Sequence, residues 1–170
     1  YFENANNNGV DTIFNYTFVP DPADDDRLHL LANTTTAPTV AGAAAVKAVV
    51  DVSGGLTGGN FNLGTLVTDT NTVDVVVLNN GNTTDANLGT NTDGTDLLAY
   101  LGVAADAADG IQMDGNNHAL YLVAFDNGNA YLYRADSGGG SNIAVASEIT
   151  LMGIFDTVSQ ATSLGNFYMY

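Results

Sequence analysis

The chain has 170 residues and a mass of 17.6 kDa, which suits a single domain. Hydrophobic residues make up 45% of it, enough for a buried core, and this argues against a disordered chain. Only 3 Lys and Arg residues stand against 19 Asp and Glu residues, which gives a formal net charge of -16. Phosphate groups would meet almost no counter-charge, so we expect neither nucleic acid nor an anionic membrane surface as a partner.

The chain contains no cysteine, which excludes disulfides and any zinc site built on thiolates. No apolar run approaches the roughly 20 residues needed to span a bilayer, so we expect no membrane insertion. The sequence opens at Tyr1 without a basic and apolar leader, and we expect a processed product or a part of a longer chain.

Most of the chain carries the β-branched and aromatic alternation that predicts strands, after a linker-like segment at residues 1–10. In the strand predicted at residues 72–79, before a long polar loop, Val73, Val75 and Val77 share one face. In the strand predicted at residues 143–154, Ile149 and Leu151 point inward. The strands are predicted at residues 12–19, 26–31, the Val-rich end of 39–52, 60–68, 72–79 and 143–154.

One helix is predicted near residues 95–101, where Gly102 provides the stop. Its apolar stripe consists of Leu97, Leu98 and Leu101, and its candidate caps are Thr92, Asp93 and Thr95. At about two turns, such a helix needs to pack on a sheet to persist.

Asn127-Gly128 lies between two aromatic and aliphatic runs, the strongest short signal for a β-hairpin. Both faces of the predicted hairpin are apolar, so it is sandwiched between layers or keeps one face for a partner. A two-residue turn sets three cross-strand pairs, Leu122 with Tyr133, Val123 with Leu132 and Ala124 with Tyr131. We therefore expect one all-β domain over residues 1–170, a mainly antiparallel sandwich or flattened roll with one short helix.

No catalytic constellation emerges from the sequence. Asp136-Ser137-Gly138-Gly139 echoes the serine segment of trypsin-like proteases, but such a serine needs a histidine base and a carboxylate. His29 and His118 are the only histidines, and neither has the flanking residues of that family. Without Trp, the chain also lacks the usual aromatic platform of a glycosidase, so we expect no enzyme and disfavour a secreted hydrolase fragment.

Clusters of Asp on loops predict calcium, which prefers six to eight oxygen ligands. Almost all acids are Asp, and a charge of -16 favours bound cations over bare self-repulsion. The predicted ligands are Asp24, Asp25, Asp26, Asp109 and Asp114, although no twelve-residue EF-hand loop is present. The alternative is that these residues are solvated turns that keep a β-rich surface soluble.

Aromatic residues are more numerous in the second half than one small core easily buries, which predicts a contact surface for a second copy or a parent protein. The predicted interface residues are Tyr121, Phe125, Tyr131, Tyr133, Phe167, Tyr168 and Tyr170. The alternative is that these rings are ordinary core.

Four stretches in the second half run in a characteristic order: TDLLAYLGVAADAADG, YLVAFDNGNAYLYRAD, EITLMGI and the tail DTVSQATSLGNFYMY. With them, residues 93–170 resemble the C-terminal region of RTX-type bacterial proteins exported by type I secretion, including S-layer proteins of that kind. Residues 11–31 are similar to the segment that follows the calcium repeats of that family. The Gly-Gly-x-Gly-x-Asp repeats themselves are missing here, so the resemblance assigns no calcium ligand.

The resemblance implies an uncleaved C-terminal export signal and folding outside the cell, where calcium is abundant. Together with the residues it predicts a secreted, non-enzymatic module at a bacterial surface, the export or assembly domain of an S-layer or filament protein, self-associating and stabilised by calcium. The alternative is a calcium-dependent adhesin or a carbohydrate-binding module.

Overall fold

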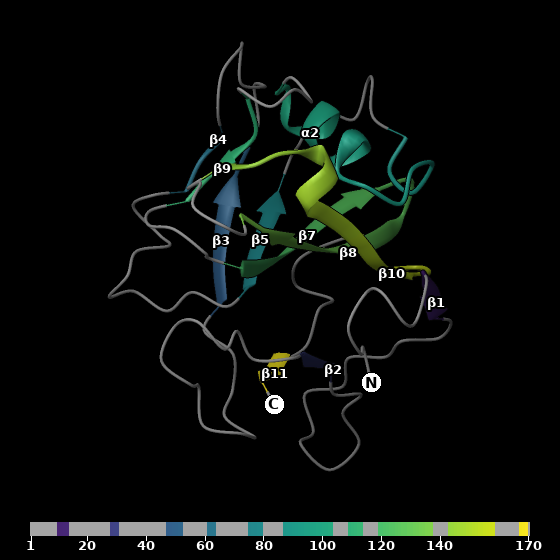
Figure 1. The fold of residues 1–170 in the computed structure, drawn as a ribbon. Coiled ribbons are helices and arrows are strands. Elements are labelled where there is room, and N and C mark those ends of the chain that lie inside the picture. Colours follow the sequence, from purple (N-terminus) through teal and green to yellow (C-terminus); the bar gives the residue numbers. More distant parts are fainter. Residues whose placement is uncertain are drawn as a thin grey trace.

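A computed structural model describes residues 10–13, 28–30, 47–52, 61–63, 75–79, 87–103, 109–113, 119–137, 143–158 and 167–169. Its centre is a six-stranded sheet in the order β1-β10-β8-β7-β5-β3 (Figure 1). These strands are β1 (Asp11–Ile13), β3 (Lys47–Asp51), β5 (Val75–Asn79), β7 (Ala119–Asp126), β8 (Asn129–Asp136) and β10 (Ile149–Phe155).

Two small sheets and one short helix complete the described part. One sheet pairs β11 (Phe167–Met169) with β2 (Leu28–Leu30), and the other has the order β4 (Phe61–Asn62), β6 (Ile111–Gln112), β9 (Ile143–Ala144). The helix is α2 (Thr95–Leu101), and a 3-10 turn, η1 (Ala146–Glu148), precedes β10. The all-β class with one short helix is confirmed.

The β7–β8 hairpin has the predicted register, with Leu122 opposite Tyr133 and Val123 opposite Leu132. Its turn needs positive φ at both central residues, and Asn127 and Gly128 adopt 50° and 80°. Asn tolerates this conformation better than most residues, and Gly has no Cβ to oppose it.

Pairing within the central sheet is mixed, where the sequence suggested mainly antiparallel strands. β7, β8 and β10 are antiparallel neighbours, whereas β1 with β10, β5 with β7, and β3 with β5 pair in parallel. Parallel neighbours need a long crossover connection. The connection from β5 to β7 contains α2, which is how the helix comes to lie over the sheet (Figure 1).

Several predicted strands are shorter or broken in the structure. The predicted strand 143–154 is divided by η1, because Glu148 folds back and its carboxylate accepts a hydrogen bond from the Val145 amide at 3.2 Å. A bulge between Leu151 and Gly153 then bends β10 against β8. β1 and β4 cover the start of predicted strands whose remainders, residues 14–19 and 64–68, lie outside the described residues.

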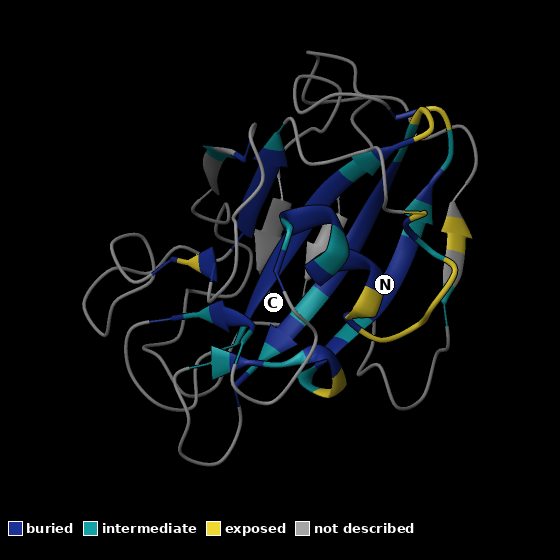
Figure 2. Cartoon of the chain, turned by 90° about the horizontal axis from the view of Figure 1, so that it is seen from above, coloured by how far each residue is buried: buried dark blue, intermediate teal, exposed yellow. Residues whose placement is uncertain are grey.

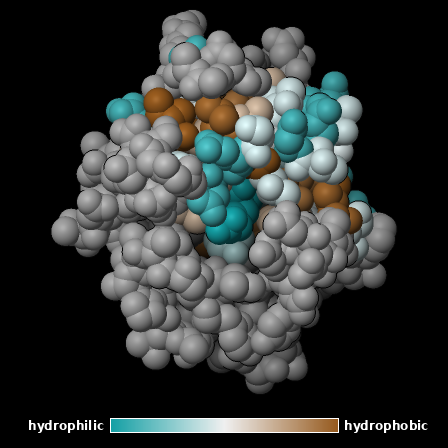
Figure 3. Space-filling view, viewed as in Figure 1, coloured by the Kyte–Doolittle hydropathy of each residue, from teal (hydrophilic) through white to brown (hydrophobic). Residues whose placement is uncertain are grey.

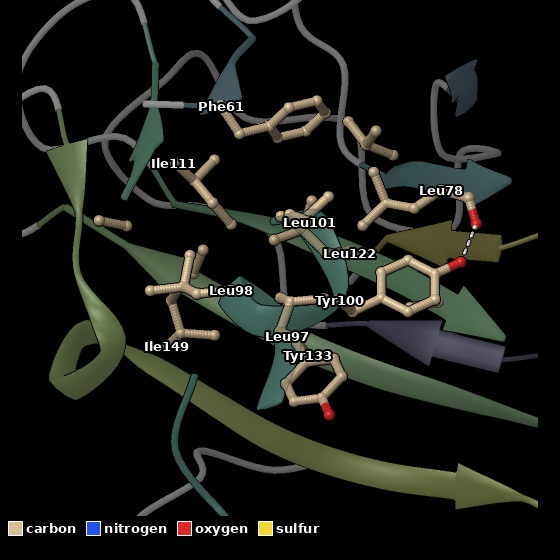
Figure 4. Packing of buried hydrophobic residues seen from close by; sticks show 14 of the residues in the cluster. Phe61, Leu78, Leu97, Leu98, Tyr100, Leu101, Ile111, Leu122, Tyr133 and Ile149 are labelled. Atoms are coloured by element: carbon tan, nitrogen blue, oxygen red, sulfur yellow. Dashed lines mark hydrogen bonds between the residues drawn. The ribbon is translucent and has the colours of Figure 1, made fainter. Parts of the chain in front are cut away.

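Helix α2 packs its predicted stripe into the core, where Leu97, Leu98 and Leu101 are at most 1% exposed (Figure 4). The helix ends at Gly102 with φ 73°, as expected. It begins at Gly94 and not at a side-chain cap, and the Asp93 carboxylate instead accepts a hydrogen bond from the Thr95 amide at 3.0 Å. The sheet face below α2 and residues of β4, β6 and β9 belong to the same cluster.

The central strands are buried on both faces, as Figure 2 shows by their dark blue colour. In β5, Val75 and Val77 lie on one face and Val76 and Leu78 on the other, and all four are 0% exposed. Val73 lies outside the described residues. In the hairpin, Val123 and Leu132 on the face away from α2 are likewise 0% exposed. The sheet is therefore the middle layer of the fold, which is the sandwiched arrangement expected for the hairpin.

Candidate functional site

Of the predicted calcium ligands, the structure describes Asp109 alone; Asp24, Asp25, Asp26 and Asp114 lie outside the described residues. Asp109 is half-buried and lies two residues before the start of β6. Within the described residues, no group of three or more His, Cys, Asp or Glu side chains is placed to hold a metal ion. The calcium sites stay a prediction.

The predicted interface residues fall into three groups. Tyr121, Tyr131 and Tyr133 are 4%, 6% and 0% exposed, so their rings have little surface left for a partner, and their packing favours the core alternative. Phe125 is half-buried on β7. Phe167 and Tyr168 belong to β11, which pairs in parallel with β2, and Tyr170 lies outside the described residues.

The most ordered polar arrangement lies where residues 87–94 cross the end of the hairpin. Two buried carboxylates hold this loop, and we call Asp96 and Asp126 with their donors the carboxylate clasp. The Asp96 carboxylate accepts two hydrogen bonds from Asn91, one from its backbone N–H at 2.7 Å and one from its side-chain Nδ2 at 2.6 Å. Asp126 accepts from the Leu88 amide at 3.3 Å and from Asn127 Nδ2 at 3.0 Å. Because these acceptors are charged, the bonds are stronger than neutral ones.

Apart from the carboxylates of Asp96 and Asp126, close packing also keeps the loop at residues 87–94 against the hairpin. Gly89 has φ 87°, and a Cβ at this position would lie 2.7 Å from Cε1 of Tyr131. Gly94 is equally restricted, because its Cβ would lie 2.6 Å from that of Ile149. On β10, the Leu151 amide donates a hydrogen bond to the carbonyl of Thr92 in this loop at 2.8 Å. The loop is thus fixed to both β8 and β10.

The hydroxyl of Tyr133 is buried near the clasp and has no hydrogen-bond partner among the residues that the structure describes. It points away from the leucines of α2 (Figure 4). Burial first, and then the negative charge of Asp96, raise the pKa of Tyr133 far above its ordinary value of 10.0. A backbone group of Gly89 approaches closely enough to offset part of this rise. Tyr133 therefore stays neutral at physiological pH.

From its sequence, the segment up to Gly94 is predicted to be a long polar loop, without the clasp. The signal that points to the clasp is the spacing of Asn91 and Asp96 on either side of Gly94, because short polar side chains on turns hydrogen-bond nearby backbone groups. The second carboxylate, Asp126, is the last residue of the buried strand β7 and lies 38 residues from Leu88, and no local pattern links the two.

The described side chains offer no catalytic arrangement. Ser137, the one serine singled out from the sequence, is 0% exposed, so its hydroxyl is closed to a substrate. His118 lies outside the described residues, and of His29 only the backbone in β2 is described. The clasp carboxylates are occupied by N–H donors, and Arg134 pairs with Asp136 at 2.7 Å, where each side chain is 36% exposed. The arrangement of these described groups holds a loop on a sheet.

On the face seen in Figure 1, the described residues form a mixed surface in which hydrophobic groups emerge in separate patches between hydrophilic ones (Figure 3). No helix of the described residues is long and apolar enough to cross a membrane. No protein-family description, no curated protein and no solved structure matches this chain.

Proposed function

We propose that the chain is a non-enzymatic structural module, secreted to a bacterial surface, that assembles with copies of itself or with its parent surface protein and is stabilised by calcium. The observation that carries the proposal is a net charge of -16 on a chain whose central sheet is buried on both faces. Such a molecule has a rigid apolar interior and an exterior that needs an external counter-charge.

The packing of the described part supports a structural role. All four residues from Val75 to Leu78 and the paired residues Val123 and Leu132 are 0% exposed. The two buried carboxylates hold backbone, because Asp126 accepts a hydrogen bond from the Leu88 amide and Asp96 from the Asn91 amide. A fold stabilised in this way suits a module whose task is to keep its shape.

The charge supports dependence on cations. Among the described carboxylates, Asp136 has Arg134 beside it, but the whole chain has only 3 Lys and Arg residues for 19 acids. Two such surfaces repel each other, so association requires either bridging cations or contacts strong enough to offset the repulsion. Calcium, with its preference for carboxylate oxygens, fits this surface.

The test combines sedimentation velocity with thermal unfolding in calcium, in magnesium and in chelator. We expect calcium to raise both the Tm and the sedimentation coefficient, because a ligand of the native state stabilises it by mass action. Magnesium controls for general screening of charge. Melting curves that coincide in calcium and chelator, with a monomer at every concentration, would contradict the proposal.

A further inference from the structure

The outer edge of β10 is covered by two segments that are far apart in the sequence. Residues Thr150 and Leu151 are covered by the loop before α2, through the hydrogen bond from the Leu151 amide to Thr92 and a bridge between Asp93 and Thr150. Residues 153–155 are covered by β1, whose three residues pair in parallel with them. Two independent covers therefore share one edge.

The two covers are held very differently. The loop continues directly into α2 and is fixed by the carboxylate clasp. β1 pairs with β10 alone among the described strands, and Thr12 at its centre is exposed. Val10, directly before β1, is partly buried against the core. Pairing at three residues on one edge, with an exposed side chain at the centre, gives little resistance to local opening.

An uncovered β10 edge is unfavourable, because unpaired N–H and C=O groups beside buried side chains are a template for another strand. Leu151 and Phe155 of β10 are each 1% exposed. The strand that fits this edge is β1, and every copy of the chain carries the same β1 and the same edge. Pairing between copies therefore reproduces the contacts that β1 makes within one copy.

The connection to the rest of the chain allows such an exchange. Fourteen residues, 14–27, separate the end of β1 from the start of β2. A chain of that length spans at most about 50 Å when fully extended, which exceeds the diameter of a domain of this size. The connection after β1 is therefore long enough for β1 to leave the β10 edge of its own copy and to reach the β10 edge of a neighbouring copy.

We propose that β1 is an exchangeable strand, which pairs with residues 153–155 of a second copy and links the copies by strand addition. This deepens the proposed self-association and rests on it. Each copy donates one strand and accepts another. Where each copy donates to the next, the contact is head-to-tail and extends into a chain of copies, whereas reciprocal exchange closes a dimer. Calcium promotes the exchange by lowering the repulsion between the acidic copies.

The experiment uses the variant Thr12→Cys/Ile154→Cys, because these two residues are partners in the β1–β10 register and the chain has no other cysteine. Full-length protein is prepared in ordinary and in ¹⁵N-labelled form, mixed at high concentration with calcium, incubated and oxidised. Mass spectrometry of the disulfide-linked peptides then detects links between copies by the peptides that carry both isotopes, because a link within one copy always carries a single isotope.

We expect mixed-isotope peptides for about half of the links between copies, together with a ladder on a non-reducing gel. The pair Thr12→Cys/Ser147→Cys is the matched control, because exposed Ser147 lies before β10 and outside its register with β1. Links of a single isotope at every concentration, in a sample that sedimentation shows to be assembled, would overturn strand exchange and leave the proposed assembly standing. A sample that stays monomeric overturns both.

Ile154 is partly buried, and a cysteine there could weaken the fold. A second variant avoids this by placing a photo-crosslinking amino acid at exposed position 12 and leaving β10 unchanged. Crosslinks from position 12 to the peptide containing residues 153–155, with both isotopes present, support the exchange. Crosslinks to that peptide in one isotope only contradict it.

Discussion

The β7–β8 hairpin and β1 are strands of the same sheet, but they differ in almost every property that holds a strand in place. The hairpin has a neighbour on each edge and eight paired positions, and both of its faces are buried. β1 has three paired positions on one edge, and its central residue Thr12 is exposed. The stability of the fold therefore lies at the centre of the sheet, and exchange with other molecules is possible at its margin.

The largest effect is expected from a cavity at the centre. Leu122→Ala removes a side chain that is 0% exposed and belongs to the core below α2, and should lower the free energy of unfolding by about 2–5 kcal/mol. Thr12→Ala is the control at the edge and should change it by no more than about 0.5 kcal/mol. Urea denaturation measures both, and equal effects would remove the contrast between centre and edge.

A smaller loss is expected when the carboxylate clasp is opened. Asp96→Ala removes the acceptor of two hydrogen bonds from Asn91 and should cost about 1.5–3 kcal/mol, because bonds to a buried charge are worth more than neutral ones. Asp93→Ala in the same loop is the control, since its exposed carboxylate accepts one bond, and about 1 kcal/mol is expected. If the two variants unfold at the same urea concentration, the clasp adds nothing beyond ordinary capping.

The hairpin and the helix were predictable because their signals are local. Asn127-Gly128 specifies a turn, and that turn sets the register of every pair in the hairpin. Leu97, Leu98, Leu101 and Gly102 likewise define a helix within one short window. In both cases neighbouring residues contain all the information that the element needs.

The parallel pairs and the clasp were not predictable, because they join residues that are distant in the sequence. Val75 pairs with Tyr121, and the carboxylate of Asp126 receives the amide of Leu88. The alternation of valines suggested one buried face for β5, but Val75 and Val77 on one face and Val76 and Leu78 on the other are all 0% exposed, while β3 and β7 pair with its two edges. A strand buried on both faces has no polar side to reveal its partners.

The smallest effect at neutral pH is expected from the hydroxyl of Tyr133. Tyr133→Phe removes a buried group without a partner in the described structure, so stability should stay equal or rise by up to about 1 kcal/mol. Tyr100→Phe is the control, because the hydroxyl of Tyr100 donates to the carbonyl of Leu78 at 3.4 Å, and it should lose about 1 kcal/mol. A loss of the same size in both would show that the Tyr133 hydroxyl has a stabilising partner.

The same variant has a larger effect in alkali. Because the pKa of Tyr133 is raised in the folded state, the native protein keeps a proton that the unfolded chain loses above pH 10.0. The stabilisation from this proton is complete below that pH and falls by about 1.4 kcal/mol per pH unit above it. Tyr133→Phe should flatten the alkaline decline of stability by that slope, and an unchanged decline would contradict the burial of the hydroxyl.

Amide hydrogen exchange, followed residue by residue in the unmodified protein at low concentration, tests the contrast between a fixed centre and an exchangeable edge most directly. The account predicts that Val123 and Leu132 exchange only through global unfolding, whereas the amides of β1 that bond to β10 exchange through local opening, at least 100-fold faster. The amide of Leu151, held by Thr92, should follow the slower class. Amides of β1 that exchange as slowly as Val123 would show that β1 opens only when the whole fold does, and would contradict the account.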